Sequence, residues 1–240
     1  MKKEVKLMKG NEAIAEAAVR AGCDGYFGYP ITPQSEIIET LREMRPWEMT
    51  GMTVVQSESE VASINMVYGA ACCGKKAMTT SSSPGVSLMS EGISYIAGAE
   101  LPCVVVNVQR GGPGLGTIQP SQSDYFQAVK GGGHGDFKQI VLAPNSVKEM
   151  YDFVFLGFEL AFKYRILVMI LTDGVIGQMM EKVELSDALP RMTDEFIDKN
   201  YGSWALTGKK DRAYNIVTSL ELDPGRQEQV NERLQTKYRE

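Results

Sequence analysis

The chain has 240 residues, of which 43% are hydrophobic, and a net charge of −5. This size is typical of one large domain, or of a domain with an appendage. The acidic balance disfavours nucleic acid or an anionic membrane as a partner. We find no secretory signal pattern and no apolar run long enough to cross a bilayer, so we expect a cytoplasmic protein.

Cysteine and histidine usage excludes several classes of site. The four cysteines form no C-x-x-C pair and none is next to a histidine, so neither zinc nor an iron–sulfur cluster is indicated in this chain. His134 is the only histidine, which makes a Ser-His-Asp hydrolase improbable.

Short apolar segments alternate with helical patterns through the first three quarters of the chain. The predicted strands are 25–29, 52–56, 77–80, 103–108, 140–142 and 166–171. The spacing of apolar residues predicts helices at 11–21, 34–44, 58–73, 88–96, 124–129 and 147–162. This rhythm predicts right-handed βαβ units in an α/β fold, with a doubly wound, mostly parallel sheet covered by helices on both faces.

The turn at residues 28–33 connects the first predicted strand of this sheet to a helix. We expect Thr32 to be the N-cap of that helix and Pro33 to be its first residue. Hydroxyl and backbone N–H groups at such a turn favour an anion such as a carboxylate, although a simple helix cap explains the same residues.

The end of the chain has a different character. From residue 181 to 240, 22 of 60 residues are charged and the alternation of strands and helices stops. We therefore predict a domain at 1–180 and a charged linker or arm at 181–240, outside the core. A helix beginning at Pro224 has a thin apolar stripe, and we expect the chain to end where a further domain would begin.

Polar residues follow several predicted strands, and the carboxyl ends of parallel strands form the ligand-binding edge of such sheets. Glu60 has two interpretations: residues 57–60 fit a capping box, or its carboxyl binds a ring nitrogen of a cofactor in a dry pocket. Arg110 emerges from a buried strand into a glycine-rich loop, which favours bidentate binding of a carboxylate or phosphate. The glycine runs at 111–116 and 131–135 lack the spacing of nucleotide-binding loops.

Several motifs, in the order in which they occur along the chain, resemble the α-type subunit of the 2-oxoacid:ferredoxin oxidoreductases. The part they resemble is the domain that binds the pyrimidine of thiamine diphosphate. The motifs are 29–33 (YPITP), 56–60 (QSESE), 81–85 (SSSPG) and 109–114 (QRGGPG), with 204–208 (WALTG) and 222–224 (LDP) further on. The serine turn at 81–83 and the loop at 112–116 are most similar to the 2-oxoisovalerate, or branched-chain 2-oxoacid, branch. The 2-oxoglutarate branch is expected to have glycine where Ser83 stands.

The resemblance implies roles for four residues. Glu60 matches the glutamate that hydrogen-bonds the pyrimidine of thiamine diphosphate and acts in catalysis. Pro30 lies where backbone lines the pyrimidine pocket. Thr32 and Arg110 match the residues that hold the substrate carboxylate.

The resemblance also implies partners. The motif that binds Mg²⁺ and the diphosphate is absent, with Asp173 and Gly174 the nearest match, so a β-subunit should carry that half of the site and the Mg²⁺. A γ-subunit and a ferredoxin-type subunit with the iron–sulfur clusters are expected beside it. Oxidative decarboxylation would then give an acyl-CoA from coenzyme A and pass electrons to ferredoxin.

The sequence is also compatible with other functions. The substrate could be 2-oxoglutarate or another 2-oxoacid. The chain could belong to a non-redox thiamine-dependent decarboxylase, which a β-subunit lacking cluster cysteines would favour. It could also be a scaffolding chain that retains the fold and binds no ligand.

Overall fold

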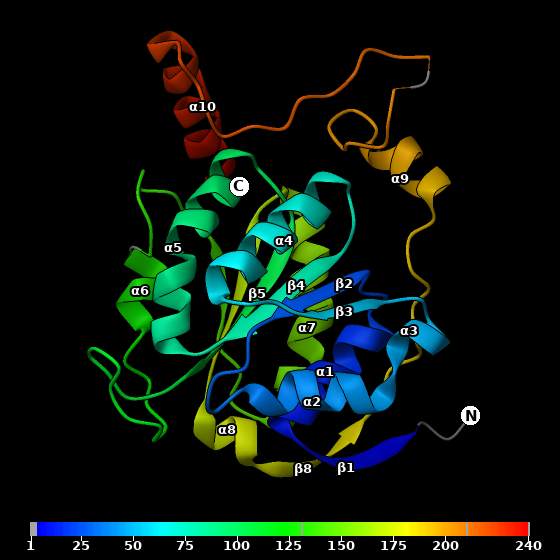
Figure 1. Ribbon diagram of the computed structural model, residues 1–240, viewed down its shortest axis with the longest axis vertical. Helices are drawn as coiled ribbons and strands as arrows, with labels where there is room; N and C mark the ends of the chain where they lie inside the picture. Colours follow the sequence, from blue (N-terminus) through cyan, green and yellow to red (C-terminus); the bar gives the residue numbers. More distant parts are fainter. Residues whose placement is uncertain (1–3, 131, 210, 240) are drawn as a thin grey trace.

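The structure, a computed structural model, describes residues 4–130, 132–209 and 211–239. Its centre is a six-stranded, entirely parallel sheet within the described residues (Figure 1). In spatial order the strands are β3 (Thr53–Gln56), β2 (Gly25–Gly28), β4 (Ala77–Ser81), β5 (Cys103–Gln109), β7 (Leu167–Asp173) and β6 (Ile140–Leu142). All six predicted strands are confirmed, and so is the α/β fold class.

Helices cover both faces of this sheet, as predicted. Short helices at 46–49, 174–178 and 194–201 were not expected, because each has too few residues to display helical spacing. The helices are α1 (Gly10–Arg20), α2 (Ser35–Met44), α3 (Pro46–Met49), α4 (Glu60–Cys72), α5 (Ser83–Gly98), α6 (Tyr125–Lys130), α7 (Val147–Tyr164), α8 (Gly174–Gln178), α9 (Asp194–Tyr201) and α10 (Pro224–Lys237).

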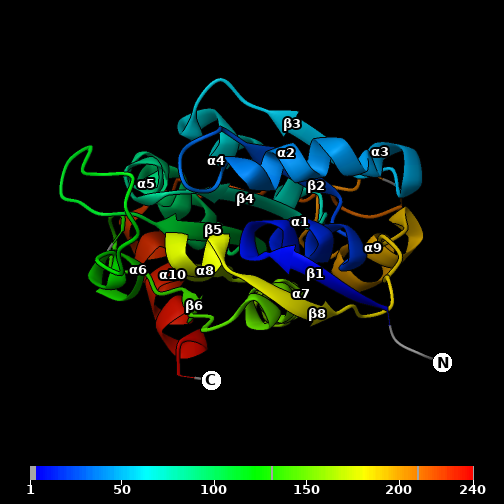
Figure 2. The ribbon, with the colours of Figure 1, turned by 90° about the horizontal axis from the view of Figure 1, so that it is seen from below.

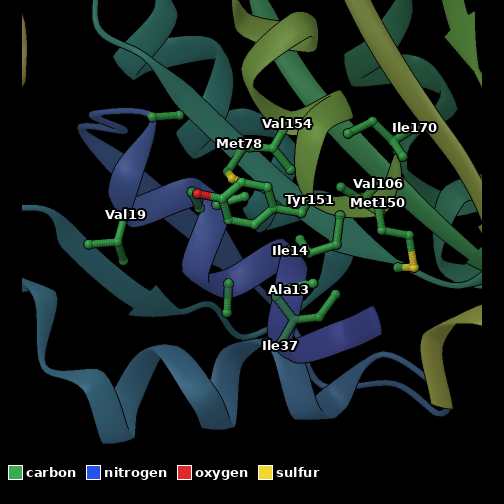
Figure 3. Packing of buried hydrophobic residues seen from close by; sticks show 14 of the residues in the cluster. Ala13, Ile14, Val19, Ile37, Met78, Val106, Met150, Tyr151, Val154 and Ile170 are labelled. Atoms are coloured by element: carbon green, nitrogen blue, oxygen red, sulfur yellow. The ribbon is translucent and has the colours of Figure 1, made fainter. Parts of the chain in front are cut away.

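Two clusters of buried apolar side chains attach the helices to the sheet. One cluster joins α1, α2 and α7 to one face, and Figure 3 shows Ile14, Met78 and Tyr151 close together in it. The other joins α4 and α5 to the opposite face. The seven residues of β5 are all buried, and they alternate between the two clusters: Val104 belongs to the first and Val105 to the second. A strand buried on both faces therefore reads as a continuous apolar run.

The sequence did not predict a second sheet, which has two antiparallel strands. It pairs β1 (Val5–Lys9) with β8 (Met180–Glu184), and Figure 2 shows the two strands side by side. Most of their residues are charged or exposed, so the sequence carries little apolar signal. Val183 and Leu185 are nevertheless buried in the first cluster, against the expectation that residues 181–240 lie outside the core.

The turn after β2 also differs from the prediction. The N-cap of α2 is Gln34, so Thr32 is not the cap and Pro33 is not the first helical residue; the peptide bond between them is cis. The buried Gln34 donates from Nε2 to the Tyr29 carbonyl oxygen at 2.9 Å, and its Oε1 accepts from Thr80 Oγ1 at 2.5 Å. This amide ties the turn to β4, and the helix begins only after it.

A carboxylate just after the end of α5 contributes to the attachment of the last helix, α10. Glu100 is 8% exposed and accepts hydrogen bonds from Arg233 Nε at 2.6 Å and from Lys237 Nζ. Burial alone would raise the pKa of Glu100, but the hydrogen bonds and charges of Lys237 and Arg233 lower it below 4.5.

In the described part of the chain, no helix is both long and apolar enough to cross a membrane.

Replacing Glu100 with glutamine should release α10, because a neutral amide cannot offset two cations. Hydrogen bonds to charged groups contribute about 1.5–3 kcal/mol, so amide hydrogen exchange in α10 should accelerate accordingly. Since the folded-state pKa is lowered, the contribution is present above the unfolded pKa and is lost as the pH falls through the folded value. Glu232→Gln, on the exposed side of α10, is the control. Equal protection in both variants would contradict the role of Glu100.

Candidate active site

The carboxyl ends of β2, β4 and β5 lie next to one another in the sheet, and the turns that follow them carry the candidate residues. Thr32 follows β2, Ser81 ends β4, and Arg110 follows β5. Glu60 is the first residue of the helix that follows β3. The loop between β5 and α6 projects from this edge at the lower left of Figure 1.

Arg110 lies at the centre of this edge and is 6% exposed. Its Nη1 donates to the Thr32 carbonyl oxygen at 3.0 Å, and its Nη2 donates to the Leu115 carbonyl oxygen at 3.1 Å. Its Nε is buried and has no hydrogen-bond partner among the described residues. The structure thus brings Arg110 and Thr32 together, although the contact uses the backbone of Thr32 and the threonine itself is exposed.

Glu60 does not form the capping box that its spacing allows. The N-cap of α4 is Ser59, whose Oγ accepts from the Ala62 N–H at 3.2 Å, so Glu60 is one residue into the helix rather than three. Glu60 is 6% exposed, and within the described residues its carboxyl makes no hydrogen bond or ion pair. Glu58, the neighbouring carboxylate, is exposed and accepts from the Ser59 hydroxyl at 2.9 Å.

The Glu60 carboxyl rests against a glycine. A Cβ on Gly85 would lie 2.8 Å from Glu60 Oε1 and would overlap Ser81 Oγ, so only glycine leaves both groups in place. The hydroxyls of Ser81 and Ser82 are buried and unpaired in the described part of the structure. An unpaired buried polar group costs about 1–3 kcal/mol, so these hydroxyls call for a further hydrogen-bond partner, such as an ordered water or a ligand.

Other residues of this edge have structural partners. Pro30 is half-buried in the turn between β2 and α2. Asp173 is the N-cap of α8: its Oδ1 accepts from Val175 N at 2.7 Å, and its Oδ2 accepts from Gln122 Nε2 at 2.8 Å. No group of three or more His, Cys, Asp or Glu side chains that could hold a metal ion occurs among the described residues.

The sequence did not indicate the network beneath Arg110, which joins Ser83, Asn107, Gln109 and Asp124. Its members lie up to 41 residues apart in the chain. Asp124 appears in the sequence only as the start of a short helix. Its position at the start of a predicted helix, after a glycine-rich loop, is the one local signal that could have indicated a role for it.

The chain is similar to known proteins. The chain is 52% identical to ketoisovalerate oxidoreductase subunit VorB of Methanothermobacter thermautotrophicus, over 97% of this chain and 64% of that protein. It is 48% identical to 2-oxoglutarate synthase subunit KorA of Methanocaldococcus jannaschii, over 77% of this chain and 50% of that protein. The chain therefore spans less than two thirds of the length of these relatives.

A solved structure has the same fold. The 2-oxoglutarate:ferredoxin oxidoreductase from Magnetococcus marinus, with 2-oxoglutarate, coenzyme A and succinyl-CoA bound, matches with a TM-score of 0.83 and 32% identity, over 98% of this chain and 44% of that one. The family model for the thiamine diphosphate-binding domain of pyruvate flavodoxin/ferredoxin oxidoreductase matches residues 16–232. The predicted resemblance is confirmed, and the chain belongs to this family of thiamine diphosphate-binding oxidoreductase domains.

Proposed function

We propose that this chain is the pyrimidine-binding subunit of a 2-oxoacid:ferredoxin oxidoreductase that acts on 2-oxoisovalerate. The observation that carries the proposal is Glu60, a residue that is 6% exposed and whose carboxyl makes no hydrogen bond or ion pair within the described residues and rests on Gly85. The 52% identity to a ketoisovalerate oxidoreductase subunit supports the branched-chain substrate.

The residues at this edge fit the aminopyrimidine of thiamine diphosphate. Glu60 offers a carboxyl oxygen to a ring nitrogen, and the gap over Gly85 leaves space for the carboxyl. Pro30 stands in the neighbouring turn, where its backbone would line the pocket. When bound, thiamine diphosphate supplies an electron sink for decarboxylation of the 2-oxo acid. Glu60 holds a proton between its carboxyl and the ring nitrogen, which is its proposed catalytic role.

Arg110 is proposed to orient the substrate carboxylate. A guanidinium has five N–H groups, and two of those of Arg110 are used by carbonyl oxygens. Three N–H groups are left, among them the Nε–H, which is buried and has no partner among the described residues, and a guanidinium with unused N–H groups suits a carboxylate. The Thr32 hydroxyl belongs to the turn that Arg110 contacts and is proposed as a second donor to this carboxylate.

Partner chains are proposed to complete the enzyme. A β-subunit would supply the diphosphate and Mg²⁺ site, and a γ-subunit and a ferredoxin-type subunit would complete transfer to coenzyme A and, through iron–sulfur clusters, to ferredoxin. Support comes from four large exposed apolar side chains beside the site, which we call the apolar rim: Leu115, Ile118, Tyr125 and Phe126. Such patches on a soluble protein mark surfaces that a partner covers.

2-Oxoglutarate is the second candidate substrate, favoured by the 48% identity to a 2-oxoglutarate synthase subunit. Comparing kcat/KM of the complete complex for 2-oxoisovalerate and 2-oxoglutarate decides between the two.

Glu60→Gln in the complete complex should lower 2-oxoisovalerate-dependent reduction of a viologen dye about 100-fold or more, since the amide cannot exchange a proton with the ring nitrogen. Assembly, followed by size-exclusion chromatography, should be unchanged. Glu58→Gln removes an exposed carboxylate two residues away and should retain activity. Full activity of Glu60→Gln would remove Glu60 from the mechanism.

Gly85→Ala should displace Glu60, because the added methyl group overlaps Ser81 Oγ and approaches Glu60 Oε1. We expect a loss of about 1–3 kcal/mol in the free energy of unfolding and weaker thiamine diphosphate binding, both measured on purified complex. Gly69→Ala is the matched control in α4, because a Cβ there meets no atom within 4 Å. Equal thiamine diphosphate affinity in the two variants would argue against the proposed pocket.

Arg110→Ala should raise the KM for the 2-oxo acid by an amount that corresponds to about 2–5 kcal/mol, the usual cost of removing one partner of a buried charge pair. Arg110→Lys keeps the charge but not the planar pair of donors and should recover only part of the loss. Steady-state kinetics of the complex measures both effects. A KM unchanged in Arg110→Ala would place the substrate carboxylate elsewhere.

A further inference from the structure

Both ends of the loop that follows β5 meet at one hydroxyl group. Ser83 Oγ lies 2.6 Å from Asp124 Oδ2, and it accepts from the Arg110 backbone N–H at 3.0 Å. It also lies 3.0 Å from the Arg110 carbonyl oxygen. A hydroxyl has one proton, and the shorter contact with a carboxylate is the stronger one. Ser83 therefore donates to Asp124 and keeps a lone pair for the Arg110 N–H.

Asp124 is itself fixed from two sides. Its Oδ2 accepts from Asn107 Nδ2 at 2.9 Å, and its backbone N–H donates to Gln109 Oε1 at 3.0 Å. Asn107 Oδ1 in turn accepts from the Ser83 N–H at 3.0 Å. Ser83, Asn107 and Gln109 are all buried, and hydrogen bonds in such surroundings are stronger than in water.

Together with the β-bridge between Arg110 and Pro120, this network fixes the backbone from which the Arg110 side chain extends. The backbone of Arg110 is held by Ser83, and its guanidinium then reaches the carbonyl oxygens of Thr32 and Leu115. Without the Asp124 carboxylate, the Ser83 proton would turn to the Arg110 carbonyl oxygen and the fixed orientation of the hydroxyl would be lost. The end of β5 would then be tied to the start of α6 only through the Asp124 backbone N–H and Gln109 Oε1.

We propose that Asp124 is a positioning residue that sets the orientation of Arg110 through the hydroxyl of Ser83. The inference rests on the proposed role of Arg110 in binding a substrate carboxylate. It adds that the affinity for the 2-oxo acid depends on a carboxylate 14 positions further along the chain, which need not touch the substrate.

The first test uses the chain without substrate or cofactor. In Asp124→Ala, hydrogen exchange at the Arg110 amide should accelerate at least tenfold, because Ser83 Oγ is its acceptor. Asp124→Asn should restore much of the protection, since both recorded bonds go to one oxygen, which an amide also provides. Ser123→Ala, at an exposed hydroxyl of the same loop, is the control. Unchanged exchange in Asp124→Ala would overturn the proposal.

The second test uses kinetics of the complete complex. Asp124→Ala should raise the KM for 2-oxoisovalerate at least tenfold with kcat changed less than threefold, and Ser83→Ala, which keeps the carboxylate, should do the same. If Asp124 acts only through Arg110, it should add nothing further in an Arg110→Ala background, which is the signature of coupled residues. A purely structural residue would lower the melting temperature without this pattern.

The outcomes separate the two proposals. If Arg110→Ala raises KM and Asp124→Ala does not, the positioning role is wrong and the proposed function stands. If Arg110→Ala leaves KM unchanged, the proposed substrate contact is wrong and the role of Asp124 in substrate binding is wrong with it. Additive effects of the two substitutions would also overturn the inference, because Asp124 would then act independently of Arg110.

Discussion

The candidate site depends on a buried guanidinium whose charge has no acidic partner among the described residues. Arg110 is held by two backbone carbonyl oxygens, which satisfy hydrogen bonds without neutralising the charge. Burying an uncompensated charge costs several kcal/mol, so the fold maintains Arg110 there at the expense of stability. The same contacts tie the turn after β2 to the loop after β5. One side chain thus both assembles the edge and leaves it favourable for an anion.

Glu60 is an acidic residue at the same edge that also lacks a partner of opposite charge among the described residues. As a residue it is as little exposed as Arg110, yet the two are not paired with each other, and Gly85 leaves the space beside the carboxyl free of a side chain. Two buried groups of opposite charge kept apart at one edge offer separate sites, one for a ring nitrogen and one for a carboxylate. A ligand carrying both features, or a cofactor and a substrate bound side by side, would relieve both.

The sequence predicted those parts of the structure that rest on local patterns. Short apolar segments that alternate with helical patterns identified all six strands, and because parallel strands end at one edge, the convergence of Thr32 and Arg110 followed from chain order. The N-cap of α2 was misplaced because the side chain that fixes the turn, Gln34, bonds to Thr80 on another strand. The capping box at Glu60 failed because Ser59 competes with Ser57 for the cap. Asp124 was missed because its partners are distant in sequence.

The same edge explains why this chain alone would leave the proposed site open. The apolar rim lies on the loop and helix that follow Arg110, and α4, which begins at Glu60, also exposes Val61 and Met66. Large apolar side chains gathered at one edge favour a partner that covers them. Covering that surface would also exclude water from Glu60 and Arg110 and so strengthen their electrostatic interactions with a ligand. In the proposed enzyme, assembly and activation of the site are therefore one event, because the partner that buries the rim also lowers the dielectric around the two charges.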